Sequence, residues 1–306
     1  MSWVSFFKKV LFLLTIFILG DFVLSVILNY GLNKYYGINQ DPDILINGSS
    51  MAMSGFNRSD IEAMTGKSVA SYCHEGVTVT ERYQMIKHFF HMNPDGLDLI
   101  IYEVNPVIFS GIETAENIHT IFYPYMDDQY IDSFVRSHAD IKEYWVHKII
   151  RTKRFDSRLL STVIRGYLSN FENVKTNEID INSLRPLIQQ KDKVPVRMND
   201  SLVETFEKTM HLIEARGVRV IIVMMPMYHI KLQTFNKIEY EFLCNYFTEF
   251  CSNREYLDFL NLNMDSIIHD TKYFADPLHF NVNGQNYITN VLGSYLVDQK
   301  PSNQMP

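Results

Sequence analysis

Leu99-Ile100-Ile101-Tyr102-Glu103-Val104 is a nearly continuous apolar run in the first third of the chain. Six such residues suit a strand that is buried on both faces of a parallel sheet. Two other runs have the same character, residues 44–47 before it and residues 218–224 after it. Together they predict the interior strands of an α/β fold.

Segments with a helical pattern separate these strands. Gly217 follows the pattern at 201–216, as a residue that ends a helix often does. Strands that alternate with helices predict a three-layer sandwich with a central parallel sheet, of the flavodoxin-like kind. Further helices are expected at 59–64, 80–91, 237–251 and 285–296, a second strand at 68–72 and a weaker strand at 256–260.

Open α/β sheets bind ligands at the carboxyl ends of their strands. Ser50, Gly76, Asn105 and His229 all come shortly after a predicted strand. We therefore expect these four residues on one edge of the sheet.

Asp276-Pro277-Leu278-His279, near the other end of the chain, brings together a carboxylate and an imidazole. A carboxylate can hold a histidine ring in one tautomer, and the ring can then take a proton from a serine. Ser50, at the tip of the first strand, is the candidate nucleophile. Ser50, Asp276 and His279 together predict a serine hydrolase or an acyltransferase.

The same residues resemble the SGNH/GDSL hydrolase superfamily, in particular its membrane-anchored, DltD-like and polysaccharide O-acylation-associated branch. Gly48-Ser49-Ser50, with Gly55-Phe56-Asn57 after it, is similar to the first block of that branch. His279 precedes Phe280-Asn281 and Gly284, which resembles the final block. The resemblance implies that Ser50 attacks, that His279 is the general base and later the acid, and that Asp276 orients it.

The resemblance also implies three donors to an oxyanion: the backbone amides of Ser50 and Gly76 and the side chain of Asn105. The third block departs from the usual Gly-x-Asn-Asp, because this chain has Glu103-Val104-Asn105-Pro106. Asn105 could instead be an ordinary cap at the end of a strand. Glu103 either points into the site or holds a loop amide.

Two further histidines, His74 and His229, are expected to line the substrate cleft. His88 and His91 lie three residues apart on a predicted helix, but no carboxylate or cysteine completes a zinc site with them. We expect no metal and no cofactor. Cys244 and Cys251 could pair in an oxidising compartment.

The amino-terminal segment differs from the rest. Lys8-Lys9 precedes residues 10–28, a stretch of 19 mostly apolar residues, which is close to the ~20 that a membrane-spanning helix needs. The positive pair favours a cytoplasmic amino terminus, with the rest of the chain outside the cytoplasm. Asp21, inside this stretch, is either tolerated there or paired with a partner membrane protein.

The chain is therefore expected to have a cytoplasmic segment at 1–9, a transmembrane anchor at 10–30, a juxtamembrane linker at 31–41, an SGNH-like domain at 42–300 and a tail at 301–306. Residues 112–195 break the alternation of strands and helices and predict a mostly helical insertion. If it excludes water from the site, it would favour acyl transfer over hydrolysis.

At 306 residues with 46% hydrophobic content, the chain can form one large core. A formal charge of −7 without basic runs argues against binding to nucleic acid. The leading hypothesis is an extracytoplasmic serine esterase or O-acyltransferase that acts on a cell-envelope polysaccharide or glycopolymer. The resemblance implies a multi-span membrane acyltransferase as its partner.

The alternative hypothesis is a catalytically inert SGNH-like scaffold that binds envelope polymer or a membrane partner. The unusual third block favours it, and so does Met51, where many anchored relatives carry a basic or polar residue.

Overall fold

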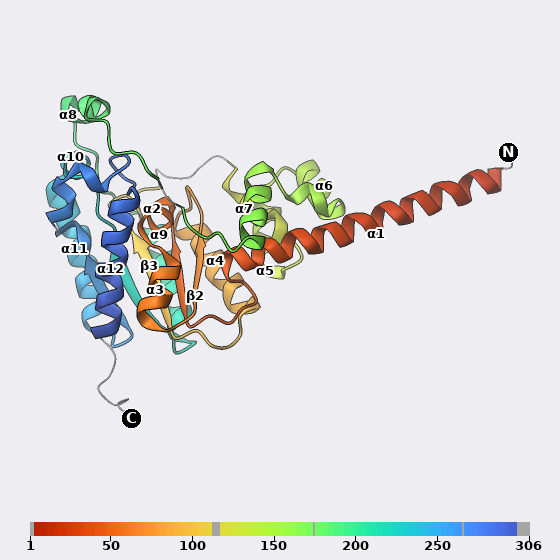
Figure 1. The fold of residues 1–306 in the computed structure, drawn as a ribbon, viewed down its shortest axis with the longest axis horizontal. Helices are drawn as coiled ribbons and strands as arrows, with labels where there is room; N and C mark the ends of the chain where they lie inside the picture. Colours follow the sequence, from red (N-terminus) through yellow and green to blue (C-terminus); the bar gives the residue numbers. More distant parts are fainter. Residues whose placement is uncertain (1–2, 112–116, 174, 265, 299–306) are drawn as a thin grey trace. The chain divides into compact units, whose positions relative to one another are not determined.

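The computed structural model describes residues 3–111, 117–173, 175–264 and 266–298. The chain divides into two compact units. The first comprises Met1–Tyr36 and Asn117–Asn170, and the second comprises Gly37–Glu116 and Phe171–Pro306. Each unit is described separately below (Figure 1).

A five-stranded parallel sheet forms the centre of the second unit, with strand order β2-β1-β3-β4-β5. The predicted central parallel sheet is confirmed. β1 and β3 lie inside the sheet and are buried along nearly their whole length, as expected from their apolar runs. The strands are β1 (Ile44–Gly48), β2 (Val69–Cys73), β3 (Leu99–Val104), β4 (Arg219–Met224) and β5 (Leu257–Asn261).

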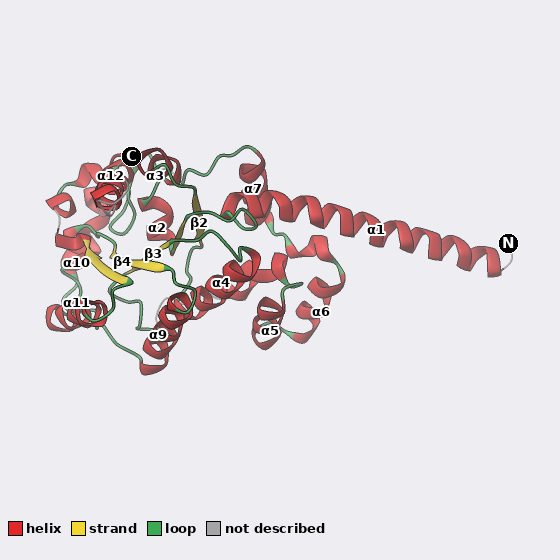
Figure 2. Ribbon diagram, turned by 90° about the horizontal axis from the view of Figure 1, so that it is seen from below, coloured by secondary structure: helices red, strands yellow, loops and turns green. Residues whose placement is uncertain are grey.

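Helices cover both faces of this sheet, which gives the three-layer sandwich. Figure 2 shows α2, α3 and α12 on one face and α4, α9 and α11 on the other. Their bounds are α2 (Ser50–Gly55), α3 (Arg58–Thr65), α4 (Val79–Met92), α9 (Asp200–Glu214), α11 (Lys237–Ser252) and α12 (Val282–Asp298).

Local capping explains where several of these helices begin and end. The side chains of Thr78 and Glu81 form a reciprocal capping box at the start of α4. Gly66 ends α3 in a left-handed conformation, with φ of 70°. The remaining short helices of this unit are η3 (Ile181–Leu184), α8 (Arg185–Gln189), α10 (His229–Leu232), η4 (Leu262–Met264), η5 (Ser266–His269) and η6 (Thr271–Tyr273).

The first unit consists of the amino-terminal helix and a group of short helices. α1 (Trp3–Tyr36) is long and apolar enough to cross a membrane. α7 packs along its second half, where Gly31 and Gly166 let the two backbones approach closely. The other helices here are η1 (Ile118–Tyr125), α5 (Gln129–His138), α6 (Ile141–Ile149), η2 (Arg151–Arg154) and α7 (Ser157–Tyr167).

The expected linker at 31–41 and the expected insertion at 112–195 do not coincide with the elements and units of the structure. α1 continues through residues 31–36, which the sequence assigns to a linker. The segment expected to be one insertion at 112–195 belongs to both units: residues 117–170 join α1, and the part from Phe171 onward joins the sheet. Residues 112–116 and the expected tail at 301–306 lie outside the described residues.

Candidate active site

The turn after β1 presents two adjacent serines in different roles. Ser49 is the N-cap of α2, and its side chain accepts a hydrogen bond from the Met51 amide. Ser50 is the first residue of α2, so its amide belongs to the helical turn whose N–H groups lack partners within the helix. Gly48 is required just before them, because a Cβ there would lie 2.6 Å from Ala52 Cβ and 2.8 Å from Glu103 Cβ.

Ser50, His279 and Asp276 form an unbroken chain of hydrogen bonds. Ser50 Oγ lies 2.8 Å from His279 Nε2. His279 Nδ1 lies 2.9 Å from both carboxylate oxygens of Asp276. Since an ionised carboxylate only accepts, Nδ1 carries the proton and Nε2 is left to accept from the serine hydroxyl. This is the arrangement in which an imidazole can remove a proton from a serine.

The loop between η6 and α12 holds the imidazole in place. Asp276 Oδ1 accepts the amides of Leu278 and His279, each at 2.9 Å, so the carboxylate also fixes the backbone of the loop. Tyr228 N donates to Pro277 O at 3.0 Å, which ties the loop to the segment after β4. The loop is therefore fixed internally by Asp276 and is tied to the segment after β4 by Pro277.

The carboxyl group of Asp276 is held in its ionised form. Burial raises its pKa, but the hydrogen bond from His279, the Leu278 amide, the charge of His279 and the Lys175 ammonium together bring the pKa well below its usual range. Lys175 Nζ lies 3.1 Å from Asp276 Oδ2. No sequence motif marked Lys175, which belongs to the part of the expected insertion that joins the sheet unit.

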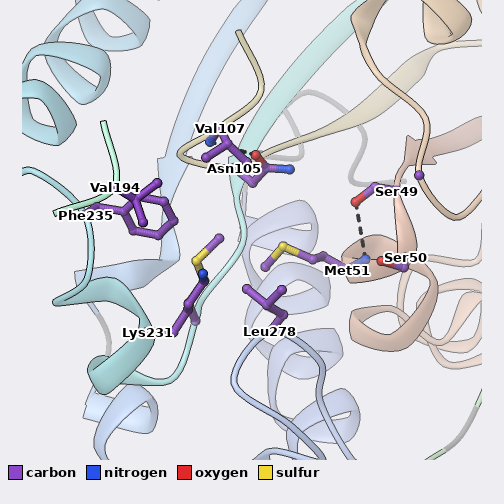
Figure 3. Close-up of a pocket in the computed structure, with 11 residues that line it drawn as sticks. Ser49, Ser50, Met51, Asn105, Val107, Val194, Lys231, Phe235 and Leu278 are labelled. Atoms are coloured by element: carbon purple, nitrogen blue, oxygen red, sulfur yellow. Dashed lines mark hydrogen bonds between the residues drawn. The ribbon is translucent and has the colours of Figure 1, made fainter. Parts of the chain in front are cut away.

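A cavity of about 360 Å³ opens beside Ser50 (Figure 3). Gly76 lines it, with φ of 71°, and Asn105 lines it from the end of β3. In Figure 3 the side-chain amide of Asn105 is turned to the side on which Ser49 and Ser50 lie. The other lining residues are mostly apolar and are Met51, Val107, Val194, Met227, Lys231, Phe235 and Leu278, with Ser49.

Glu103 does not line this cavity and lies fully buried behind the serine turn. Its Oε2 accepts the Ser49 amide at 2.8 Å, and its Oε1 accepts from Asn105 Nδ2 at 3.4 Å. Of the two readings of the sequence, the structure has Glu103 holding a loop amide. It connects the turn that carries Ser50 to the side chain of Asn105.

Arg82, on α4, stabilises the ends of the strands that carry the serine turn and Asn105, although no sequence motif marks it. Its guanidinium donates to both Asn47 oxygens at 2.9 Å and to Glu103 O at 2.6 Å, and stacks over Tyr102. An arginine that is only 2% exposed must have all these partners to be stable in a core. It fixes the ends of β1 and β3 relative to each other.

The histidines expected in the cleft lie elsewhere. His74 is buried beside Tyr72, and its amide extends the pairing of β2 with Gly48. His229 begins α10 and packs against Tyr228 and His269. Neither is among the residues that line the cavity. His88 hydrogen-bonds the Tyr72 hydroxyl at 3.3 Å, and Cys244 and Cys251 are both free thiols.

The chain matches no protein-family profile and no curated protein sequence. Among solved structures it is similar to a protein of Streptococcus pneumonia, provisionally described as a platelet activating factor, with a TM-score of 0.47 and 11% identity over 94% of this chain and 99% of that one. It is also similar to a protein of Bacteroides fragilis, provisionally described as an acylhydrolase, with a TM-score of 0.43 and 9% identity over 83% of this chain and 86% of that one. Similarity at this level assigns no function.

Proposed function

We propose that this chain is a serine esterase or O-acyltransferase of the SGNH type, with Ser50 as nucleophile, His279 as general base and Asp276 as the orienting carboxylate. The observation that carries the proposal is the chain of hydrogen bonds from Ser50 Oγ through His279 to Asp276, at 2.8 and 2.9 Å. These are the distances that direct proton transfer requires.

The reaction then has two steps. Ser50 Oγ attacks an acyl carbonyl while His279 Nε2 takes the hydroxyl proton, and Asp276 stabilises the imidazolium that forms. The tetrahedral intermediate collapses to an acyl-serine when His279 returns the proton to the leaving alcohol. A water or an acceptor hydroxyl repeats the attack and releases the acyl group from Ser50.

Three donors are proposed to bind the oxyanion: the amides of Ser50 and Gly76 and the side chain of Asn105. All three residues line the same cavity. Glu103 accepts a hydrogen bond from the Asn105 side-chain amide at 3.4 Å and so holds this amide at the edge of the cavity. Donors that are fixed before the reaction stabilise developing charge at no cost in reorganisation.

The acyl group is proposed to occupy the cavity, since its walls are largely apolar and its size is in the range of small-ligand sites. The alcohol is proposed to belong to a cell-envelope polysaccharide or glycopolymer. The resemblance of Gly48-Ser49-Ser50 to the membrane-anchored branch supports this, and so does α1, which would anchor the chain with Lys8-Lys9 on the cytoplasmic side. We propose that a multi-span membrane acyltransferase supplies the acyl groups that this chain would transfer.

Turnover of a short-chain aryl ester by the purified full-length chain in detergent tests the proposal. Wild type should release the chromophore, and Ser50→Ala should not. Ser49→Ala is the matched control, because it changes the neighbouring hydroxyl that caps α2 and should keep most of the activity. An inert scaffold would give the same background rate for all three proteins.

A further inference from the structure

Two helices of the first unit present apolar side chains to the outside. On α6, Ile141, Trp145 and Ile149 recur every four residues and are 62%, 51% and 72% exposed. Residues at this spacing lie on one face of a helix. A row of large apolar residues that no described residue covers is unusual on a protein surrounded by water.

α7 repeats the pattern. Its Leu159, Val163 and Gly166 are buried, and Gly166 lies against α1. A second row, formed by Leu160, Ile164 and the C-cap residue Leu168, is exposed, with Leu168 at 72%. The apolar surface of α7 is therefore wider than the part of it that packs against α1. We call the two exposed rows, Ile141/Trp145/Ile149 and Leu160/Ile164/Leu168, the outer apolar face.

The position of Asp21 sets the depth of this unit in a bilayer. Asp21 lies twelve residues after Lys9, or roughly 18 Å along the helix, which is short of the ~30 Å thickness of the hydrocarbon core. Its carboxylate accepts the amides of Arg151 and Thr152, at 2.8 and 3.0 Å, and the Thr152 hydroxyl. If α1 crosses a membrane from Lys9 onward, residues 151–152 must lie at the depth of Asp21.

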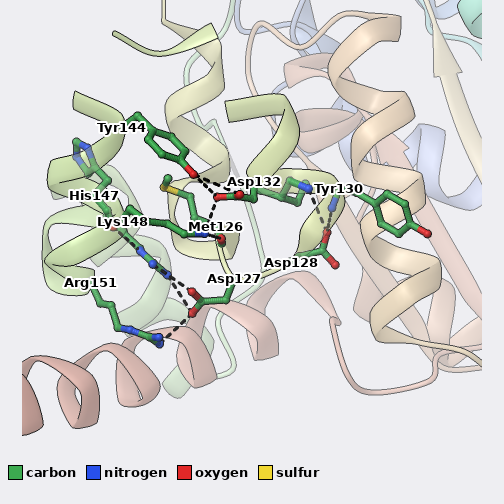
Figure 4. A network of polar contacts seen from close by, with 11 residues as sticks. Met126, Asp127, Asp128, Tyr130, Asp132, Tyr144, His147, Lys148 and Arg151 are labelled. Carbon is green, nitrogen blue, oxygen red and sulfur yellow. Dashed lines mark hydrogen bonds and ion pairs between the residues drawn. The ribbon is translucent and has the colours of Figure 1, made fainter. Parts of the chain in front are cut away.

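Several charged groups near this point, although not Lys153, are paired with described residues of the same unit (Figure 4). Arg151 and Arg154 both reach Asp127, at 2.9 and 3.2 Å. Lys148 donates to Asp132 at 2.6 Å and to the Met126 carbonyl. Tyr144 donates to the same Asp132. Pairing of this kind is what ionisable groups need in a medium of low dielectric constant.

We propose that the outer apolar face lies in the lipid bilayer, in the leaflet that α1 enters after Asp21, so that α6, η2 and α7 form a wedge beside the anchor. The inference rests on the proposed insertion of α1 and extends it: the chain contacts lipid through three helices rather than one. The exposed apolar rows, the pairing of Lys148, Arg151 and Arg154 within the unit and the packing of α7 along α1 favour lipid as the occupant.

A partner membrane protein is the competing occupant of this face. The sequence suggested such a partner as the counterpart of Asp21. In the structure the carboxylate already has three donors from its own chain, so it needs no other protein. Purified protein in vesicles of pure lipid distinguishes the two occupants, because only lipid is then present.

Trp145 itself is the probe, since the chain has only two tryptophans. The full-length chain with Trp3→Phe carries Trp145 as its single tryptophan. It is reconstituted into phosphatidylcholine vesicles with or without bromine on the acyl chains. Bromine in contact with the indole should quench its emission, and acrylamide in the water should quench it poorly.

Two control proteins carry Trp3→Phe and Trp145→Phe plus one new tryptophan. Phe17→Trp reports insertion of α1, and Ile238→Trp reports an exposed apolar position on α11 of the other unit. We expect Trp145 to be quenched as strongly as Phe17→Trp, and Ile238→Trp to be unaffected. Quenching of Phe17→Trp without quenching of Trp145 overturns the wedge and leaves the anchor. No quenching of Phe17→Trp refutes the anchor and the wedge with it, and equal quenching of Ile238→Trp also overturns the wedge.

Discussion

Asp276 accepts hydrogen bonds from four donors, so its carboxylate both fixes the loop and orients the imidazole. The donors are the His279 ring, the backbone amides of Leu278 and His279, and the Lys175 ammonium. Asn at this position would keep an oxygen for the two amides and lose the charge. Asp276→Asn should therefore leave the fold intact and slow turnover by ~10⁴-fold, as loss of this carboxylate does in other triads.

The same substitution has a pH signature in stability. The pKa of Asp276 is lower in the folded chain than in the unfolded one. Its stabilising effect is thus complete above the unfolded value of about 3.9 and is lost as pH falls toward the folded value. The difference in melting temperature between wild type and Asp276→Asn should be largest near neutrality and should shrink below roughly pH 5. A constant difference across this range would mean that the carboxylate does not stabilise the loop.

At the scale of elements, the ends of β1 and β3 are joined through a buried carboxylate. Glu103→Gln keeps an acceptor for Ser49 N but takes away the charge that faces Arg82, and it gives Asn105 a competing donor. If Asn105 is the oxyanion donor that we propose, its displacement should lower kcat by ~10²-fold or more with a smaller change in KM. The missing partner of Arg82 should also lower the melting temperature.

A matched control for this substitution is Glu204→Gln, on α9, where the carboxylate is exposed and pairs with Lys208. Glu204→Gln should change neither kcat nor the melting temperature, since exposed ion pairs contribute little to stability. Unchanged kcat in Glu103→Gln would show that Asn105 does not depend on Glu103.

The strands and long helices could be predicted because each has its own local signal. β3 was predicted with the bounds it has, since an apolar run of six residues between polar loops has few other readings. α2 was not expected, because its six residues include Gly55 and two serines and depend on capping by Ser49 and packing against Gly48.

The pairing of Ser50 with His279 was expected at the level of residue types and strand ends. The walls of the cavity were not, because Val194, Met227, Lys231 and Phe235 reach it from segments without a motif. The roles of Arg82 and Lys175 could not be predicted for a related reason. The sequence around a single cation does not reveal which carbonyl or carboxylate the cation contacts after folding.

In the chain as a whole, the apolar helix α1 and the five-stranded sheet belong to separate compact units. Only 11% of the most apolar 18-residue stretch of α1 is buried, as expected for a helix that faces lipid. Lys8-Lys9 predicts its direction. A reporter that works only outside the cytoplasm should be active when fused after Pro306, and a cytoplasm-only reporter at the same site should be silent. The reverse pair of results would refute the proposed topology.

Covalent capture of the nucleophile tests whether Ser50 is activated by His279. The full-length chain in detergent is incubated with a fluorophosphonate, which phosphonylates a serine, with loss of fluoride, only where a neighbouring base activates the hydroxyl. Intact mass and peptide mapping should show one adduct, on Ser50. The adduct should persist in Ser49→Ala and be absent from Ser50→Ala and His279→Ala. A folded wild-type chain that acquires no adduct, or acquires it on Ser49, would contradict the assignment of Ser50, His279 and Asp276 as a catalytic triad.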